Sequence, residues 1–390
     1  MPTTTIRVRE PRELIALIPH QLGFQPDESA VVVSLREPRG RVGLVARVDL
    51  DDLSDASSGP QLARTLVTHL VHDGAARAVL VLYTADDGAV ATRAAPLVGE
   101  TAGQPHTWRS PRVRTAARHL ADAAEPYLGE VDTWVVGPRG YGGLDCTSPD
   151  CCPPGGRPLT ELESTTTGAH MVLAGSVVAA RREDLARIPR AGVDARRRAA
   201  AARVRAERRR SVAVAAGSAA VCRWRDEAIA LWRAEVAAGR DGHSGERPSR
   251  LGRIEAALGD IRVRDAILVS FVPGTGDLAE RTVGTGAGIE HEVSCAVARI
   301  VAPSDGLAPP LESTVSHRAA LEAVVAHGRL DAQAPALSLL AVLAWWSADG
   351  ARAAVLLDRA LEADPGYRLA LLVREAVDAG MPPGWVRRDG

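Results

Sequence analysis

The segment from residue 140 to residue 159, the cysteine loop, constrains the fold more than any other because its composition interrupts regular structure. It reads GYGGLDCTSPDCCPPGGRPL and holds five glycines, four prolines and three of the five cysteines of the 390-residue chain. Glycine adopts backbone angles that other residues avoid, and proline removes a backbone donor. The segment follows a strand predicted over residues 131–137. We therefore expect a constrained loop at the end of a strand.

Apolar runs and amphipathic segments alternate along the first half of the chain. Strand patterns over residues 30–35 and 42–50 are joined by a glycine-containing turn, which predicts a β-hairpin. They are followed by a helix pattern over 61–72, a continuous apolar run over 78–83 and a second helix pattern over 113–125. Such alternation is typical of α/β proteins. We predict a mostly parallel sheet with one β-hairpin and flanking helices.

The second half of the chain shows mainly helical patterns. Residues 191–250 are rich in arginine, and on a helical projection of 195–210 the arginines fall on every side. Because this leaves no apolar stripe, we expect a solvated helical connector. Residues 251–390 are predicted to be mainly helical and to end in a row of antiparallel helices with short turns. The predicted organisation is an α/β domain over 1–190, this connector, and the all-α C-terminal region.

The charge balance and the apolar runs exclude several classes of partner. The chain has 47 basic and 48 acidic side chains, so we expect no general attraction to nucleic acid. No stretch reaches the roughly 20 strongly apolar residues that cross a membrane, and the N-terminus lacks the pattern of a signal peptide. Five cysteines, three of them clustered, do not resemble a secreted disulfide framework. The prediction is a cytoplasmic protein without a membrane or nucleic-acid partner.

Polar residues near strand ends mark a candidate ligand site. In an α/β sheet, ligands bind beyond the carboxyl ends of the strands. Asp86 and Asp87 follow the run over 78–83, and the cysteine loop follows the next strand, so the two should be neighbours if their strands are. The acids could ligate Mg²⁺ or contact a ligand, although acids there more often cap a helix or turn. Arg47 and Asp49 share a face of the second hairpin strand, where a surface ion pair is favoured over a polar pair in a cleft.

Cys146, Cys151 and Cys152 allow four interpretations. A zinc site would need a fourth ligand, and the spacing Cys-x4-Cys-Cys departs from the usual Cys-x2-Cys pairs. A Cys146–Cys151 disulfide or redox switch fits a tight loop but is disfavoured in a reducing cytosol. A catalytic thiolate would need a base, and no histidine stands close in the sequence. We favour packing as small hydrophobic side chains in a rigid loop, and the sequence identifies no metal or cofactor.

Several segments resemble the actinobacterial domain of unknown function 4192 family. They are an opening motif over residues 14–33, Ala46-Arg-Val-Asp49, Leu82-Tyr-Thr-Ala-Asp86, Cys151-Cys-Pro-Pro-Gly155, Val263-Arg-Asp-Ala266 and a helical tail over 334–382. These segments occur in the same order as in the family and span nearly the whole chain. The resemblance implies an actinobacterial protein of an uncharacterised family and carries no known activity.

These observations predict a non-catalytic cytoplasmic protein with a small-ligand or metal pocket at the strand ends and a helical tail. The predicted ligand-binding residues are Arg47, Asp49, Asp86, Cys146, Cys151 and Cys152. One alternative is an enzyme that uses Asp86 with Asp49, or a cysteine thiolate, at the same strand ends. The other is a regulatory module whose helical tail binds a protein partner through an exposed apolar groove. The sequence leaves substrate and oligomeric state open.

Overall fold

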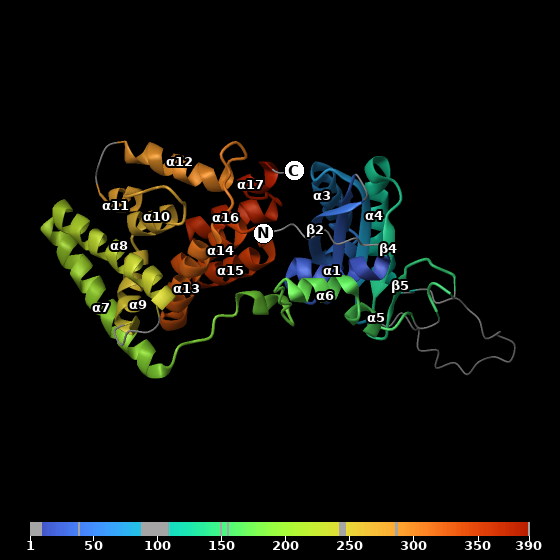
Figure 1. The fold of residues 1–390 in the computed structure, drawn as a ribbon, viewed down its shortest axis with the longest axis horizontal. Helices are drawn as coiled ribbons and strands as arrows, with labels where there is room; N and C mark the ends of the chain where they lie inside the picture. Colours follow the sequence, from blue (N-terminus) through green and yellow to red (C-terminus); the bar gives the residue numbers. More distant parts are fainter. Residues whose placement is uncertain are drawn as a thin grey trace. The chain divides into compact units, whose positions relative to one another are not determined.

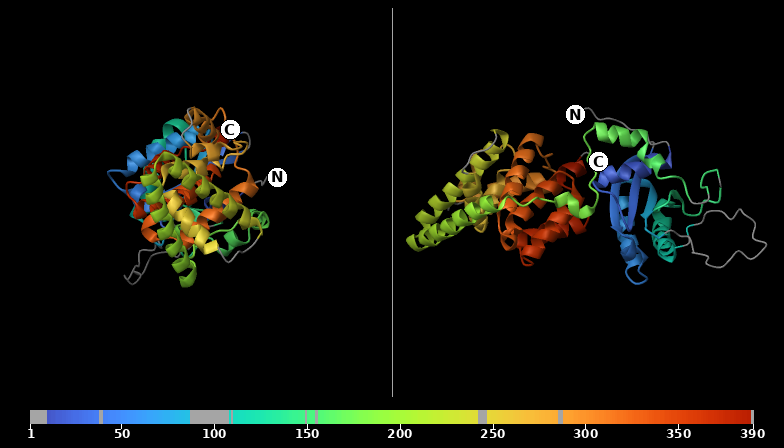
Figure 2. Two further views of the ribbon diagram at one scale, coloured as in Figure 1. Left: turned by 90° about the vertical axis from the view of Figure 1, so that its left-hand side faces the viewer. Right: turned by 90° about the horizontal axis from the view of Figure 1, so that it is seen from below.

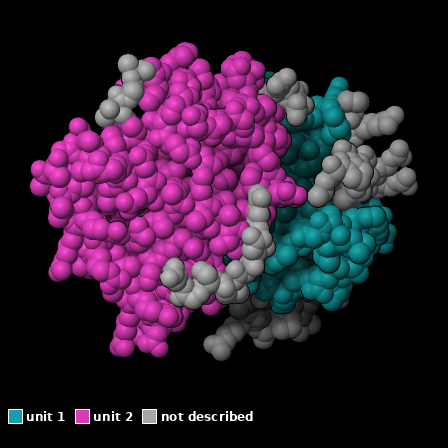
Figure 3. Space-filling view, turned by 60° about the vertical axis from the view of Figure 1, so that its left-hand side comes forward, with its two compact units in different colours: residues 1–184 teal, residues 185–390 magenta. Residues whose placement is uncertain are grey.

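The protein is seen here in a computed structural model that consists of two compact units. The described residues are 10–37, 40–86, 108, 110–148, 150–153, 156–241, 247–284 and 288–388. Residues Met1–Asp184 form the first unit and residues Leu185–Gly390 the second (Figure 3). Each unit has a hydrophobic core built from its own side chains. Each therefore has the main property of a folding domain.

The first unit is built on a five-stranded sheet of order β2-β1-β3-β4-β5 (Figure 1). The strands are β1 (Ser29–Arg36), β2 (Arg41–Asp49), β3 (Ala75–Tyr83), β4 (Asp132–Val136) and β5 (Tyr141–Gly143). β1 and β3 lie inside the sheet and are almost entirely buried over residues 30–33 and 78–83. Their continuous apolar runs suit this position, because a strand covered on both faces needs no polar alternation.

The prediction of a mostly parallel sheet is wrong. Among the described strands, three of the four pairings are antiparallel, and only β3 and β4 run parallel. The reason is the place of β3, which pairs with β1 and not with β2. β1 runs opposite to both neighbours and separates them. The order of strands and helices along the chain does not reveal that β1 lies between β2 and β3. The mixed α/β character and the β1–β2 hairpin are confirmed.

Helices α3 (Gly59–His72) and α4 (Pro111–Leu128) pack on one face of this sheet. Both have proline in the first turn, where a missing backbone N–H leaves no helical hydrogen bond unmade. Each buries one stripe at helical spacing, for example Leu66 and Leu70 in α3 and Val113 and Leu120 in α4. The other described α-helices of the unit are α1 (Pro11–Leu22), α2 (Leu50–Ser54), α5 (Thr160–Glu163) and α6 (Thr166–Leu173).

The second unit contains only helices among its described elements, so the predicted all-helical C-terminal region is confirmed. They are α7 (Val193–Ala216), α8 (Ser218–Asp241), α9 (Arg247–Leu258), α10 (Ile261–Val269), α11 (Leu278–Thr282), α12 (Ile289–Val301), α13 (Leu311–His327), α14 (Ala334–Trp346), α15 (Gly350–Ala363), α16 (Arg368–Asp378) and α17 (Gly384–Arg388), with short 3-10 turns at Arg182–Ala186 and Leu330–Ala332. α14 has no charged residue and is buried almost all round. It is the central helix of the unit.

The arginine-rich helix α7 is part of the second unit and packs along α9 (Figure 2, right). Its buried side chains are Ala199, Ala202, Arg203, Ala206 and Ala213, which recur at helical spacing. Around them the helix exposes most of its arginines, whereas Arg203 lies within the buried stripe, so the projection of the sequence does not reveal the packed side. The buried stripe consists mostly of alanine. Alanine is only weakly hydrophobic, so among many arginines it produces no clear apolar pattern in the sequence. The helix is therefore solvated on one side and packed on the other.

None of the described helices combines the length and the apolar character that crossing a membrane requires.

Candidate functional site

The carboxyl ends of β2, β3 and β4 lie at the same end of the sheet. Asp49 stands opposite Ser29, Ser29 stands opposite Tyr83 on its other side, and Tyr83 lies beside Val136. The N–H of Thr84 continues this row by donating to the carbonyl of Val136 at 3.0 Å. The residues that follow β3 and β4 are therefore neighbours, as the sequence predicts. Asp49 lies two strands away from β3, about 10 Å.

Residues at the start of α4 hold Asp86 at this end of the sheet. Its carboxylate accepts hydrogen bonds from Ser110 Oγ at 3.0 Å and Arg112 Nη2 at 3.1 Å. Arg112 also bonds Glu28 at 2.7 Å and Asp51, so one guanidinium gathers three carboxylates. The bonds from Arg112 and Ser110 hold the pKa of Asp86 below its ordinary value. Asp86 is thus ionised and paired, and it fastens α4 to the sheet. Asp87 lies outside the described residues.

Arg47 and Asp49 form an ion pair on β2. Arg47 Nη2 lies 2.7 Å from Asp49 Oδ1, and Arg47 Nε donates to Ser29 Oγ at 2.8 Å. The Arg47 side chain is 16% exposed and that of Asp49 is 56% exposed. β2 and β5 are opposite edges of the sheet, so the fold does not bring this pair to the cysteine loop.

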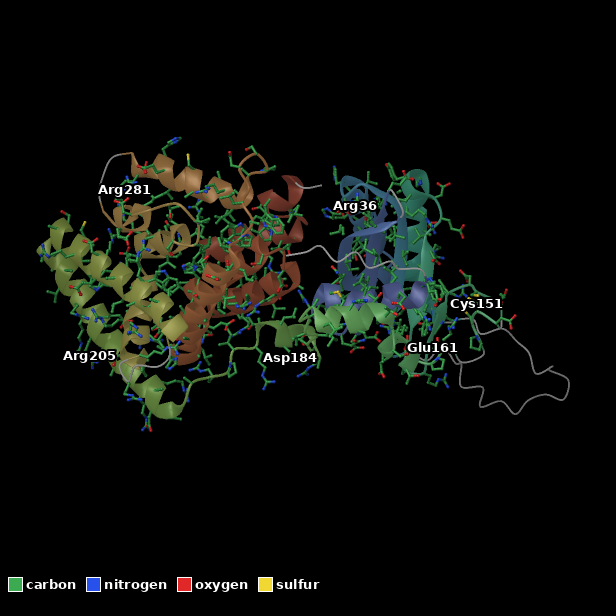
Figure 4. All side chains as sticks on the ribbon, in the orientation of Figure 1. Arg36, Cys151, Glu161, Asp184, Arg205 and Arg281 are labelled. Carbon is green, nitrogen blue, oxygen red and sulfur yellow. The ribbon has the colours of Figure 1, made fainter. Side chains whose placement is uncertain are left out.

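The fold does bring the three cysteines of the loop together. The sulfur atoms of Cys146, Cys151 and Cys152 all lie within 4.8 Å of one another. In the described part of the chain, they are the one group of three or more potential metal ligands found at such distances. All three are free thiols, and the Sγ atoms of Cys151 and Cys152 are 3.9 Å apart, far beyond a disulfide bond of about 2.05 Å. Figure 4 labels Cys151 in the loop that follows β5.

The glycines of β5 make room for this cluster. The expectation that residues 140–159 form only a loop is wrong, because Tyr141–Gly143 pairs with β4 as an edge strand. A Cβ atom at Gly143 would stand 3.0 Å from the Cβ of Cys146, and one at Gly142 would stand 3.5 Å from Cys152 Sγ. The N–H of Gly143 donates to Cys152 Sγ at 3.3 Å. The strand thus supplies both the space and a hydrogen-bond donor for the sulfur.

The loop backbone turns so that all three sulfurs face one point. The N–H groups of Cys151 and Cys152 both donate to the carbonyl of Ser148, at 3.2 and 2.8 Å. Proline fixes one backbone angle in such turns, and glycine adopts backbone angles that other residues avoid. Beside it, Arg157 Nη1 donates to the carbonyl of Cys151 at 3.5 Å and Arg157 Nε pairs with Glu161 at 3.0 Å. Arg157 thus connects the backbone of Cys151 to Glu161 of α5.

The thiols differ in acidity because their surroundings differ. Burial raises the pKa of Cys152 to about 12, although the hydrogen bond from Gly143 acts in the opposite direction. A backbone hydrogen bond at Ser148 and the neighbouring thiols lower the pKa of Cys146. Without a cation the cluster therefore keeps at least the Cys152 proton at neutral pH. A bound metal cation would remove it, since metals bind thiolates and oppose the cost of burying their charge.

The family of the chain follows from a comparison with models of known protein families. The family model described as domain of unknown function (DUF4192) matches residues 11–384. The chain belongs to this family. The resemblance predicted from sequence motifs is thereby confirmed, and the DUF4192 match includes both the cysteine loop and the helical unit. Comparisons with curated proteins and with solved structures gave no match.

The sequence did not predict the residues that connect the surroundings of Asp86 with the cysteine loop. Trp108 is buried, and its ring occupies the space beside Gly137, where a Cβ would stand 2.8 Å away. Arg114 Nε donates to the Trp108 carbonyl at 2.9 Å, and its Nη1 pairs with Asp145 of the cysteine loop at 3.1 Å. The start of α4 thus contacts the Asp86 cluster on one side and the cysteine loop on the other. A lone tryptophan and scattered arginines carry no signal of this in the sequence.

Proposed function

We propose that this DUF4192 protein is a non-catalytic metal-binding protein whose Cys146, Cys151 and Cys152 thiolates hold one soft cation, with Zn²⁺ as the best fit. The observation that carries the proposal is the convergence of three sulfurs within 4.8 Å. Sulfur ligands at about 2.3 Å from a tetrahedral zinc ion lie about 3.8 Å apart. The separation of 3.9 Å between Cys151 and Cys152 matches this geometry.

Packing alone accounts for one of the three cysteines. Cys152 is buried, whereas Cys146 is partly exposed and Cys151 exposed. Small hydrophobic side chains gain little from a place at the surface. The convergence of exposed and buried thiols on one point is better explained by a shared ligand. The N–H of Gly143 supports this proposal, because hydrogen bonds to sulfur orient thiolate ligands and stabilise their charge.

The same geometry favours binding over catalysis. Asp86 is neutralised by Arg112, and Asp49 pairs with Arg47 at the far edge of the sheet. Neither acid is placed to act as a base for a cysteine of the loop. Three free thiols side by side persist in a reducing compartment, which supports a cytoplasmic location as part of the proposal. A protein partner for the helical tail stays a prediction.

The test is metal analysis of protein purified without oxygen. We expect close to one zinc ion per chain, and three thiols that react with a thiol reagent only after a chelator is added. Cys146→Ser and Cys151→Ser should each weaken zinc binding at least about tenfold, since each removes one of three protein ligands. Cys295→Ser is the matched control, because Cys295 is exposed and lies in the second unit.

Two results would count against the metal site. One is a protein with five reactive thiols that takes up no zinc under anaerobic conditions, which leaves packing as the role of the loop. The other is zinc binding that Cys295→Ser weakens as much as Cys151→Ser does. That outcome would show adventitious binding to accessible thiols instead of a built site.

A further inference from the structure

A cavity of about 260 Å³ lies in the second unit where α7 begins. It is formed by three segments: the chain leading into α7 with the first turns of that helix, α9, and the turn that follows α13. The N–H of Ala191 donates to the carbonyl of Ala326 at 2.9 Å, and the N–H of Arg329 donates to Glu255 Oε1 at 2.8 Å. These bonds join the three segments around the cavity.

The side chains that line this cavity are predominantly cationic. Five of its ten lining residues are arginines, Arg190, Arg196, Arg197, Arg203 and Arg329, and one is an acid, Glu255. Three of the five guanidinium groups also have a carboxylate partner outside the lining: Arg197 lies 3.9 Å from Asp194, Arg203 donates to Glu207, and Arg329 pairs with Asp331. Burial raises the pKa of Glu255, although the Arg329 N–H and the Arg203 charge lower it. The remaining two arginines, Arg190 and Arg196, carry positive charge that an anion in the cavity would neutralise.

Arg203 is the most informative of these arginines. It is 9% exposed, and its Nη1 donates to Glu207 at 2.6 Å. Its Nε is buried and makes no hydrogen bond to any described residue. The carboxylate oxygen Oε2 of Glu255 lies 3.8 Å from Nε, beyond hydrogen-bond distance. A buried donor of a charged group without an acceptor is costly, and an oxyanion in the cavity would supply the acceptor.

The start of α7 adds a second source of positive potential. The helix has 24 residues, and its N-cap Gly192 provides no side-chain acceptor for the first turn. The free N–H groups and the helix dipole favour an anion at this end. Val193, the first residue of the helix, is part of the cavity wall. The first turn of α7 thus contributes to the cavity wall, and it also holds one acid, Asp194.

We propose that this cavity binds a small phosphate-bearing anion, either free phosphate or the phosphoryl group of a phosphomonoester. Guanidinium groups bind phosphate oxygens bidentately, so arginine is suited to this ligand. The volume lies just below the roughly 300–1,000 Å³ of sites for drug-sized ligands, which limits the ligand to a small one. A nucleic acid fits the observations less well, because the chain has a net charge of -1. This site is independent of the metal site in the first unit.

The test titrates the full-length protein with inorganic phosphate, diphosphate and adenosine monophosphate in a calorimeter at constant ionic strength. Arg190→Gln and Arg197→Gln each remove one guanidinium group from the cavity, and each should weaken binding about tenfold. Arg203→Gln should weaken it at least as much, with circular dichroism to verify that this variant is folded. Arg205→Gln is the matched control and should leave binding unchanged, because Arg205 is exposed on the same helix and does not line the cavity (Figure 4).

The relative affinities identify the source of the phosphate. Tighter binding of adenosine monophosphate than of phosphate supports a phosphomonoester, and the reverse order supports the free anion. No binding of any of the three probes at millimolar concentration would overturn the proposal. Binding that Arg205→Gln weakens as much as Arg197→Gln would also overturn it. Binding of a single-stranded RNA that all these variants weaken equally would replace the cavity with a distributed basic surface.

Discussion

At the scale of single residues, hydrogen bonds to largely buried polar groups connect the strands and helices of the first unit. Asp73, which follows α3, accepts hydrogen bonds from Arg36 Nε of β1 at 2.9 Å and from the N–H of Leu44 in β2 at 2.8 Å. Gly43 leaves the space, because a Cβ there would stand 2.2 Å from Asp73 Oδ2. Burial raises the pKa of Asp73, but the bonds from Arg36 and Leu44 outweigh it and hold the pKa below its ordinary value.

Asp73→Asn should lower the free energy of unfolding by about 1.5–3 kcal/mol at neutral pH, because it removes charge-assisted hydrogen bonds from a side chain that is 14% exposed. The pKa of Asp73 is lower in the folded than in the unfolded protein. Its contribution is therefore present above the unfolded pKa of about 3.9 and is lost as pH falls through the folded pKa. Urea unfolding between neutral pH and about pH 3 should show the difference between wild type and variant narrowing on acidification.

Asp52→Asn serves as the control for this measurement, since Asp52 is an exposed acid of the same unit. It should change the free energy of unfolding by less than about 0.5 kcal/mol at every pH. A constant difference between wild type and Asp73→Asn across the pH range would contradict the role of the Asp73 charge.

At the scale of elements, the second unit depends on how closely its helices approach. Gly252 of α9 faces Ala199 of α7, and a Cβ at Gly252 would stand 2.0 Å from the carbonyl oxygen of Ala199. Small residues on both helices permit this contact.

Trp345 and Trp346 of α14 contact different parts of the second unit. The ring N–H of Trp345 donates to the carbonyl of Met381, and that of Trp346 donates to the carbonyl of Leu307. Neighbouring residues of one helix thus fasten it to two parts of the unit.

Gly252→Ala should destabilise the protein although alanine is the better helix former. The gain in helix propensity is about 1 kcal/mol, whereas forcing the two helices apart costs about 1–3 kcal/mol or more. We expect a net loss that thermal unfolding detects as a lower Tm. Gly350→Ala in α15 is the control, since nothing lies within 4 Å of its Cβ position, and it should be neutral or slightly stabilising. Equal Tm values for the two variants would show that α7 and α9 are not closely packed.

At the scale of the whole molecule, the chain holds two separate hydrophobic cores. The core of the first unit consists of residues from the sheet, α2, α3, α4 and adjoining loops between positions 30 and 144. The core of the second unit surrounds α14 and uses residues from position 186 onward. Chains of 184 and 206 residues are long enough to bury most of their apolar surface.

Fragments 1–184 and 185–390 should therefore fold separately. We expect each fragment to unfold cooperatively in urea, because each retains its complete core. Circular dichroism should show a helical spectrum for residues 185–390 and a mixed α/β spectrum for residues 1–184. A fragment that stays monomeric but has no cooperative transition would contradict the division into two units.

Much of the local structure follows from the sequence itself. The apolar runs of β1 and β3 predict buried strands, and the amphipathic patterns predict α3 and α4, because burial of one face depends on spacing that a sequence displays. The uncharged α14 segment is also predicted as a helix, as one of a row of antiparallel helices, although it shows no one-sided apolar spacing because it is buried almost all round. The family is also determined by the sequence alone, through motifs that span residues 14–382 and a family match over residues 11–384.

The pairing of strands and the meeting of side chains were decided only by the tertiary structure. Any two strands can form the same backbone hydrogen bonds, so the position of β3 beside β1 depends on how the whole core packs and not on a local signal. Arg112 meets Glu28, Asp51 and Asp86 for the same reason, from places far apart in the sequence. The sequence places the three cysteines in one loop. Only the fold of that loop against β5 directs their sulfurs to a single point, because side-chain direction depends on backbone angles that composition does not specify.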